Sequence, residues 1–391
     1  MFYNVYNNRG APSQKYPGFQ LPELRGKGAG AEVGSWLRAV LAKRNKIRFA
    51  VAEMRRAILF IDEYCEYTSI NLRLSAIGKS FFIFLKPLYR QKGFDIMKNT
   101  VFKGVGTAII TPMTECGVDF ETYGRLIDWQ VAEGVNAIIA AGTTGEGSTL
   151  TDEEHREVIK FTVDRVGGKI PVIAGTGSND IAYAVELTKY SCEAGADAML
   201  VVTPYYNKAT QNGLITSFTK IADESTKPII LYNVPSRTGC NILPKTARAL
   251  AEHPNIVGIK EASGNISQIA ETISLTRGML DVYSGNDDQI VPLLSLGGKG
   301  VISVLSNVMP KKTVELCDRF FRGDIEGSAK IQLDLLNLIN ALFSEVNPIP
   351  VKAAMSAMGF CKDILRLPLT PMESQNREKL LAFMREAGIE V

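Results

Sequence analysis

Eight short runs of apolar residues recur along residues 105–307, and longer, more polar stretches separate them. The runs begin roughly 20 to 34 residues apart, which leaves room for one strand and one crossover helix in each repeat. Each run is continuously hydrophobic rather than alternating, as expected for parallel strands that are covered on both faces. The runs are Val105–Met113, Ala137–Glu146, Pro171–Gly177, Ala198–Tyr206, Pro228–Pro235, Ile256–Ser263, Leu280–Asp287 and Gly300–Asn307.

Amphipathic stretches between these runs predict helices at Asp119–Glu133, Thr151–Val166, Asp180–Glu193 and Leu214–Glu224. Eight uninterrupted units of this kind predict an α/β fold, a closed (β/α)8 TIM barrel, rather than an open sheet. A doubly wound nucleotide-binding fold would need a G-x-G-x-x-G motif after its first strand. Gly104-Val-Gly106 opens the first strand and lacks the third glycine, which disfavours that fold and a nicotinamide-dependent oxidoreductase.

The pattern becomes helical after Gly323. Ile331–Leu342 and Arg377–Ala387 are strongly amphipathic, and Pro348 and Pro350 lie between them. We therefore predict a catalytic barrel of residues 97–323 followed by a small helical domain of residues 324–391. This domain is expected to pack on the barrel or on a neighbouring subunit.

Residues 1–96 differ from the rest of the chain, because they hold 16 Lys and Arg against 7 Asp and Glu and begin with a proline-containing polar stretch. They lack the compact charged and apolar regions of a secretory signal. A transit peptide would be similarly basic but richer in serine. It also stays open whether Met97 is the natural start. We expect this extension to be weakly ordered in either case.

Composition narrows the classes of function. With 46% hydrophobic and 22% charged residues, the chain has the proportions of a soluble globular protein. Residues 97–391 hold 28 Lys and Arg against 34 Asp and Glu, so no nucleic-acid surface is expected there. No apolar stretch reaches the ~18 residues of a membrane span. Six scattered cysteines indicate a reducing, cytoplasmic compartment, and two histidines without ligand spacing argue against a metal site.

Seven of the eight runs end in reactive or turn-forming residues, and barrel enzymes build their sites from these strand ends. Lys260 follows the apolar segment Ile256–Ile259, where a buried ammonium is costly unless it is paired or neutralised. Burial favours the neutral form of a lysine amine, which can attack a carbonyl group and form a Schiff base. The alternative is that Lys260 extends to solvent or pairs with Glu261.

Four segments at different strand ends resemble the motifs of the dihydrodipicolinate synthase (4-hydroxy-tetrahydrodipicolinate synthase) family of pyruvate-dependent class I aldolases. They are Gly142-Thr-Thr-Gly-Glu146, Thr203-Pro-Tyr-Tyr-Asn207, Leu231-Tyr-Asn-Val-Pro-Ser-Arg-Thr-Gly239 and Gly258-Ile-Lys-Glu-Ala262. The resemblance covers about residues 100–391 and includes Gly285 and Asn347-Pro-Ile-Pro-Val-Lys352. It implies a Schiff-base lyase that condenses pyruvate with L-aspartate 4-semialdehyde in the diaminopimelate route to lysine. No cofactor is implied beyond the covalent imine at Lys260.

The resemblance also implies a set of catalytic residues. Lys260 would form the imine, and Tyr232 would move the proton. Thr143 would link Tyr232 to Tyr206 of a neighbouring subunit, which implies a homo-oligomer, expected as a tetramer built as a dimer of dimers. The residues alone leave other interpretations open: Tyr232 as a core aromatic, Thr143 as a turn hydroxyl bonded to its own backbone, and Tyr206 as an interface aromatic.

Thr143 and Thr144 lie in a glycine-flanked turn that suits the carboxylate of pyruvate. Arg237 offers a planar fork to a second carboxylate, that of aspartate semialdehyde, unless it is a surface arginine. The backbones of Gly285 and Ile302 match positions that line the site. Arg237 disfavours the alternative of a sialic-acid (N-acetylneuraminate) lyase or keto-deoxy-sugar acid aldolase, because that branch typically lacks it. A non-catalytic binding barrel is a further alternative.

Positions matching the allosteric cleft of lysine-regulated family members are Ser148, His155, Asn179 and Tyr205. Two other positions depart from the family pattern. Tyr183 stands where a glutamate normally binds the ammonium of the effector, and Asp152 replaces a frequent histidine. Loss of a carboxylate that pairs with a buried cation weakens binding strongly. We therefore predict weak or absent inhibition by lysine.

Overall fold

The polar strand ends come together at one closed barrel in the computed structural model, which describes residues 98–391. Eight parallel strands pair in the order β1-β10-β9-β8-β7-β6-β5-β4, and β4 closes against β1. Each strand lies in or overlaps one of the eight apolar runs, which confirms the predicted barrel. The strands are β1 (Gly104–Ala108), β4 (Ala137–Ala140), β5 (Val172–Gly175), β6 (Ala198–Val202), β7 (Ile229–Asn233), β8 (Ile256–Glu261), β9 (Asp281–Ser284) and β10 (Gly300–Ser303).

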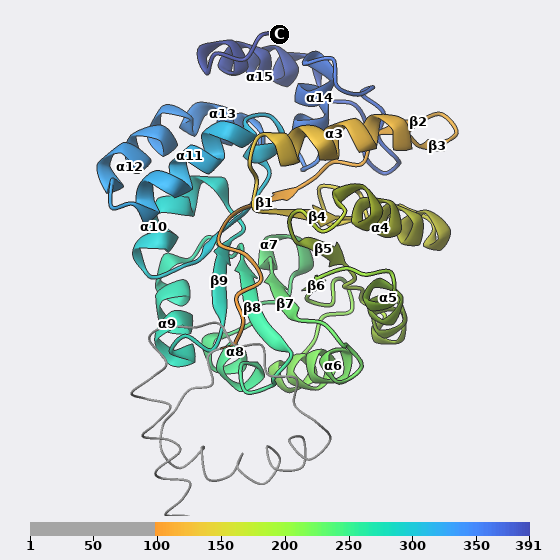
Figure 1. Cartoon of the computed structure of the whole chain (residues 1–391), viewed down its shortest axis with the longest axis vertical. Helices are drawn as coiled ribbons and strands as arrows, with labels where there is room; N and C mark the ends of the chain where they lie inside the picture. The colour runs from red at the N-terminus through yellow and green to blue at the C-terminus, as the bar shows by residue number, and fades with distance from the viewer. Residues whose placement is uncertain (1–97) are drawn as a thin grey trace, which may run out of the picture. The chain divides into compact units, whose positions relative to one another are not determined.

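Helices surround the strands on the outside of the barrel (Figure 1). The four helices expected between the first strands are all present, with ends shifted by at most a few residues. Along the chain the helices are α3 (Phe120–Ala132), α4 (Asp152–Val166), α5 (Ile181–Glu193), α6 (Gln211–Asp223), α7 (Pro235–Thr238), α8 (Pro244–Leu250), α9 (Ile266–Thr276), α10 (Ile290–Ser295) and α11 (Pro310–Phe321). Short 3-10 turns are η1 (Asp287–Gln289) and η2 (Leu305–Asn307), and a hairpin joins β2 (Met113–Thr114) to β3 (Gly117–Val118).

Local residues explain where the long helices begin. The Thr151 hydroxyl accepts a hydrogen bond from the Glu154 amide at 3.2 Å, and the Glu154 carboxylate accepts one from the Thr151 amide at 2.9 Å. This reciprocal capping box satisfies two otherwise unpaired amides at the start of α4. The Thr210 hydroxyl caps α6 in a similar way by accepting from the Gly213 amide at 3.1 Å. Such caps place each helix start directly after the polar loop of the preceding strand.

The side chains of the barrel separate into two hydrophobic clusters, because successive residues of a strand face opposite sides. The outer cluster fills the layer between the strands and the helices, as Ile138, Leu231 and Val301 do. The second set, here called the inner cluster, fills the inside of the barrel. Its members are Phe102, Ala108, Ala137, Ile139, Ile173, Ala198, Leu200, Ile230, Tyr232, Val234, Ala262, Tyr283 and Ile302.

Four further helices follow the barrel: α12 (Ile325–Asp334), α13 (Leu336–Ala341), α14 (Ile349–Ala357) and α15 (Ser374–Glu386). The single helix predicted for residues 331–342 is wrong in detail, because the chain breaks at Leu335 into α12 and α13. The region around Pro348 and Pro350, expected as a connection, instead begins α14. Proline is tolerated in the first turn of a helix, where its missing amide would have no partner.

The C-terminal segment packs against the barrel helices. Phe360, just after α14, stacks on Trp129 of α3 with ring centroids 4.5 Å apart, and α13, α14 and α15 lie together near the C-terminus (Figure 1). The division into a barrel of residues 97–323 and a helical domain of residues 324–391 stays a prediction. The weakly ordered extension expected for residues 1–96 lies outside the described residues. No helix from residue 98 onward combines the length and apolar character that crossing a membrane requires.

Candidate active site

Lys260 faces the inside of the barrel because strand β8 contains an irregularity. Ile229 pairs with Ile256, but the next residue of β7, Ile230, pairs with Gly258, so Val257 is an extra residue in β8. Ile256 belongs to the outer cluster. A strict alternation from Ile256 would therefore turn Lys260 outward as well. The extra residue reverses the alternation and directs the lysine into the barrel.

The Lys260 side chain is 5% exposed and lies over the ring of Tyr232, with its Nζ 4.3 Å from the ring centroid. Tyr232 is the register partner of Lys260 on β7 and is 7% exposed. The structure thus brings together the two residues for which the sequence predicted an imine and a proton shuttle. The alternative placements of Lys260, in open solvent or paired with Glu261, do not occur in this structure.

Glu261 instead takes part in a polar cluster on the opposite face of the same strands. Asn233 pairs in register with Glu261 and donates to both of its carboxylate oxygens at 3.1 Å. The Ser263 amide donates to Glu261 at 2.8 Å. Burial raises the pKa of Glu261, and the hydrogen bonds from Ser263 and Asn233 oppose that rise. This cluster joins the ends of β7 and β8 one residue beyond Tyr232 and Lys260.

The ends of β9 and β10 complete this side of the barrel. The Gly285 amide donates to the Glu261 carbonyl at 2.8 Å. A Cβ atom at Gly285 would lie 3.0 Å from the Lys260 Cε, so glycine leaves room for the lysine side chain. Ile302 is fully buried in the inner cluster. Of the two predicted lining positions, Gly285 follows β9, which pairs with the strand of Lys260, and Ile302 lies on β10, one strand further around the barrel.

Asp287 is a buried carboxylate that the sequence did not indicate. Its Oδ2 accepts hydrogen bonds from the amides of Val304 and Leu305 at 3.0 and 2.9 Å, which ties η1 to the chain just after β10. Burial raises the pKa of Asp287, and the positive charge of Lys260 is among the influences that lower it. Asp287 ends the apolar run Leu280–Asp287. Nothing in the sequence of that run indicates that the carboxylate is buried.

The turn after β4 carries Thr143 and Thr144. Thr144 is buried, and its hydroxyl accepts a hydrogen bond from the Asn347 side chain at 3.0 Å. The described residues give Thr143 only a backbone contact, in which its carbonyl accepts from the Glu146 amide at 3.1 Å. Within one chain, the structure therefore does not join Thr143 to Tyr232. Its predicted link between two tyrosines stays a prediction.

Arg237 lies in the short helix α7, directly after Tyr232 and its strand, and its side chain is exposed. Its guanidinium donates to the Asn347 carbonyl at 3.3 Å. Asn347 thus contacts both predicted carboxylate-binding residues, Thr144 through its side chain and Arg237 through its backbone. Asn347 belongs to the family-like segment Asn347–Lys352, but its sequence predicted no role for it. Nothing local could reveal these contacts, because Thr144 lies 203 residues away in the chain.

Tyr206 lies apart from the residues around Lys260. It follows β6 with a positive φ of 71° and is 92% exposed. A side chain this open makes no contribution to the barrel core of its own chain.

The predicted allosteric residues lie along the ends of β4, β5 and β6. Ser148 is exposed, whereas His155 on α4 is buried and its Nε2 lies 2.8 Å from the Gly175 carbonyl. Burial lowers the pKa of His155. Asn179 and Tyr205 are half-buried, and both of their backbone carbonyls accept hydrogen bonds from Asn207. Only this last pair is brought together directly.

The two residues that depart from the family pattern contact each other. The Tyr183 hydroxyl donates to the Asp152 carboxylate at 2.9 Å, and Arg156 donates to the same carboxylate at 2.8 Å. The hydrogen bond from Arg156 is the main cause that lowers the pKa of Asp152. Burial and this contact raise the pKa of Tyr183 to about 12. The phenol is therefore neutral at neutral pH.

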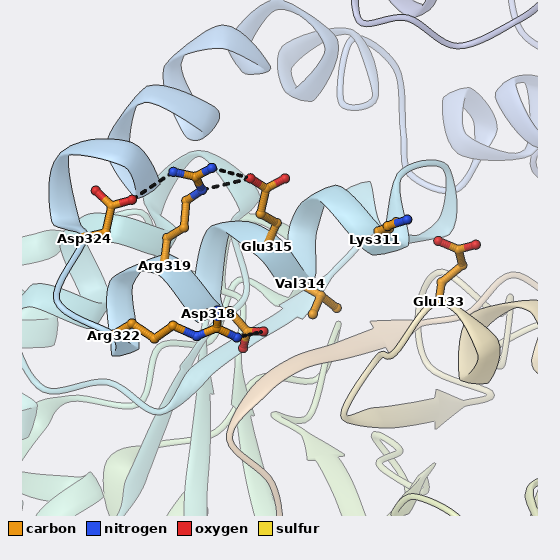
Figure 2. Close-up of a pocket in the computed structure, with 8 residues that line it drawn as sticks. All are labelled: Glu133, Lys311, Val314, Glu315, Asp318, Arg319, Arg322 and Asp324. Carbon is orange, nitrogen blue, oxygen red and sulfur yellow. Dashed lines mark hydrogen bonds and ion pairs between the residues drawn. The ribbon is translucent and has the colours of Figure 1, made fainter.

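A pocket elsewhere on the molecule does not share these features. It lies along α11 on the outside of the barrel, and several of its charged side chains pair with one another (Figure 2). Arg319 contacts Glu315 and Asp324 at 2.8 Å, and Arg322 lies 3.5 Å from Asp318. Most of the charges that line this pocket are therefore already paired within the chain. No group of His, Cys, Asp and Glu side chains suited to hold a metal occurs in residues 98–391.

Comparison with known proteins gives one consistent result. The model of the dihydrodipicolinate synthetase family matches residues 101–387. The 4-hydroxy-tetrahydrodipicolinate synthase of Acetivibrio thermocellus is 57% identical over 293 residues, which are 75% of this chain and 100% of that protein.

Solved structures agree. The chloride-inhibited dihydrodipicolinate synthase from Acinetobacter baumannii, complexed with pyruvate, has a TM-score of 0.73 at 45% identity, over 74% of this chain and 100% of that one. The corresponding enzyme from Cyanidioschyzon merolae, with lysine bound, has a TM-score of 0.73 at 41% identity, over 75% and 100% of the two chains.

Proposed function

This chain belongs to the dihydrodipicolinate synthetase family, and from that premise we infer that it is a 4-hydroxy-tetrahydrodipicolinate synthase. It is a lyase of lysine and diaminopimelate biosynthesis that condenses pyruvate with L-aspartate 4-semialdehyde. Relatives with this name are 52–57% identical over nearly their whole length. The alternative of a sialic-acid or keto-deoxy-sugar acid aldolase is disfavoured by these relatives and by the presence of Arg237. The single observation that carries the proposal is the burial of Lys260 inside the barrel beside Tyr232.

The proposed reaction begins at the Lys260 amine, which attacks the ketone carbon of pyruvate. A carbon–nitrogen bond forms, the ketone oxygen leaves as water, and a protonated imine results. Loss of a proton from the methyl group gives an enamine, whose methyl carbon then attacks the aldehyde of the second substrate, and the aldehyde oxygen takes up a proton. The amino group of the condensed product then replaces the Lys260 amine at the imine carbon, which breaks the bond to the enzyme and frees the lysine. No cofactor takes part in this proposal, because the imine itself accepts the electron pair. The burial of Lys260 places its amine inside the barrel beside Tyr232, where this proposal assigns imine formation.

Each of these steps moves a proton, and Tyr232, whose ring lies 4.3 Å from the Lys260 Nζ, is assigned to carry it. A phenol is a slow proton carrier unless partners relay the proton. We assign that relay to Thr143 and to Tyr206 of a neighbouring subunit. The 92% exposure of Tyr206 in the single chain is consistent with such a role. This relay requires at least a dimer, which we propose is part of a homotetramer. We also propose a cytoplasmic location for the enzyme.

The two carboxylates of the substrates call for separate partners. Thr143 and Thr144 are assigned to the carboxylate of pyruvate, together with the backbone at Gly285 and Ile302. Arg237 is assigned to the carboxylate of aspartate semialdehyde, since its exposed guanidinium can form two parallel hydrogen bonds to a planar group. Its contact with Asn347 fixes the guanidinium near the strand ends.

Borohydride trapping tests the proposal directly. Reduction in the presence of pyruvate should attach the three-carbon acid to Lys260, and mass spectrometry of peptides should find it there. The variant Lys260→Arg should gain nothing, because a guanidinium does not form the imine. The matched control Lys330→Arg, at an exposed lysine of α12, should be labelled at Lys260 like the wild type. An unlabelled wild-type chain, or a label on another lysine, would overturn the assignment. A substrate panel would then separate synthase from lyase activity.

A further inference from the structure

A fully buried ion pair joins the turn after β4 to helix α14. The Lys352 ammonium contacts the Glu146 carboxylate, and the two side chains are 0% and 1% exposed. Glu146 ends the Gly142–Glu146 motif, and Lys352 ends the Asn347–Lys352 segment. The reaction described above uses neither residue. Burying two charges is costly, so their presence calls for a reason beyond stability.

The pair is one of several contacts at the same place. The second carboxylate oxygen of Glu146 accepts a hydrogen bond from the Arg366 amide at 3.1 Å. Five residues before Lys352, the Asn347 side chain donates to the Thr144 hydroxyl at 3.0 Å. Glu146 also has a φ of 56°, a left-handed conformation that is unfavourable for a residue with a side chain. The surroundings must therefore hold this turn in its conformation.

These contacts all connect one short turn to one C-terminal segment. The turn carries Thr143 and Thr144, and the segment carries Asn347 and Lys352. A buried ion pair is satisfied in only one arrangement, since a shift that separates the charges leaves each of them without a partner. Two apolar side chains of the same size would tolerate such a shift. The ion pair is therefore better explained by a need to fix the position of the turn than by a contribution to stability alone.

We propose that Glu146 and Lys352 are positioning residues that hold the Thr143–Thr144 turn against α14 in the geometry that receives the carboxylate of pyruvate. This inference rests on the proposed function, because it assumes that the turn binds pyruvate. Glu146 and Lys352 touch no substrate themselves. Their effect passes through the backbone of the turn and through the Asn347–Thr144 hydrogen bond.

The test compares four variants and one control variant with the wild type. Lys352→Met keeps an unbranched side chain of similar length and removes the charge. Glu146→Gln removes the negative charge. The double variant Glu146→Gln/Lys352→Met removes both charges. Lys352→Arg retains a cation and should rescue much of the effect. The control Lys330→Met removes an exposed lysine of α12, which pairs with Asp334 and lies outside the proposed connection.

For each variant, the KM for pyruvate, the saturated kcat, the rate of borohydride trapping at Lys260 and the thermal unfolding temperature are measured. We expect Lys352→Met to raise the KM for pyruvate roughly 10- to 100-fold and to slow trapping, with a smaller change in kcat. Glu146→Gln should act in the same direction. The double variant should recover stability relative to the single variants but should keep the raised KM, because the charges are gone and the turn is still not held. The control should match the wild type.

Two outcomes would overturn the inference. A folded Lys352→Met or double variant with wild-type KM and trapping rate would show that the pair only stabilises the fold. If every variant that removes a charge failed to fold, the ion pair would likewise be required for folding and not for positioning the turn. Failure of the proposed function would give a different result. In that case borohydride and pyruvate would not label Lys260 even in the wild-type chain.

Discussion

At the scale of single residues, the chemistry around Lys260 depends on what its neighbours leave out as well as on what they supply. Tyr232 supplies an aromatic ring and a hydroxyl beside the amine. Gly285 supplies space, because any Cβ atom there would lie within 2.6 Å of the Ala262 Cβ and 3.0 Å of the Lys260 Cε. A functional lysine at this strand end therefore requires a glycine on the neighbouring strand end.

The variant Gly285→Ala tests this requirement. The added methyl group cannot be accommodated without moving Ala262 and Lys260, so we expect a loss of about 1–3 kcal/mol in the free energy of unfolding. We also expect roughly tenfold or slower imine formation, because small displacements of a reacting group are costly. Borohydride trapping and denaturant unfolding measure the two effects.

A second glycine provides the control. In α6, a Cβ atom at Gly213 would meet its nearest neighbours at 3.4 and 3.5 Å, which is ordinary contact. Gly213→Ala should leave trapping unchanged and should favour the helix by up to about 1 kcal/mol. If Gly285→Ala behaved like Gly213→Ala, the close approach of Gly285 to Lys260 would not be needed for imine formation.

At the scale of elements, helix α4 connects its own start to the C-terminal segment. Glu154 forms the capping box with Thr151, and Arg366 donates to the same carboxylate. The hydrogen bond from Arg366 is the main cause that lowers the pKa of Glu154 below its ordinary value of 4.5. One side chain thus fixes the helix start and holds a segment more than 200 residues later in the chain.

The variant Glu154→Gln should separate these two roles, because a glutamine retains the capping-box acceptor and loses the charge. A carboxyl group with a lowered pKa in the folded state contributes stability above 4.5, and this contribution disappears as the pH falls through the folded-state pKa. We expect the variant to be less stable than the wild type by about 1 kcal/mol at pH 7. The difference should close as the pH falls below 4.5. Urea unfolding at several pH values measures this, and an unchanged gap in acid would contradict it.

At the scale of the whole molecule, inhibition by lysine would require a second site that binds the effector and is coupled to the barrel interior. The positions in question lie on α4, on α5 and in the loops after β4 to β6. A tyrosine at position 183 offers no carboxylate to the ammonium of a lysine ligand. The neighbouring Asp152 carboxylate already accepts hydrogen bonds from Tyr183 and Arg156.

We expect lysine to inhibit this enzyme weakly or not at all. Titration of the condensation reaction with lysine measures the effect, and the variant Tyr183→Glu should increase the sensitivity by restoring the carboxylate. Potent inhibition of the wild type, or a Tyr183→Glu variant no more sensitive than the wild type, would contradict this explanation.

Much of this molecule follows from its sequence. Because a parallel strand buried on both faces must be apolar throughout, the eight runs located every strand of the barrel. Barrel sites form at the carboxyl ends of strands, and the sequence predicted Lys260 and Tyr232 at two such ends, where the structure brings them together. The helix broken at Leu335 and the proline-containing start of α14 were missed, since local patterns are weakest at element boundaries.

Only the tertiary structure determines that the Lys260 side chain points into the barrel. Side chains of a strand alternate with a period of two, so the pairing register with the neighbouring strand determines which of them enter the barrel. The extra residue Val257 opposite β7 sets that register. The sequence of the segment Ile256–Glu261 contains no signal that predicts this extra residue. The same holds for Glu146 with Lys352 and for Thr144 with Asn347, which meet only because the barrel closes and the C-terminal segment returns to it. The sequence by itself determined which chemical groups stand at the strand ends, and the folded barrel decided which of them meet.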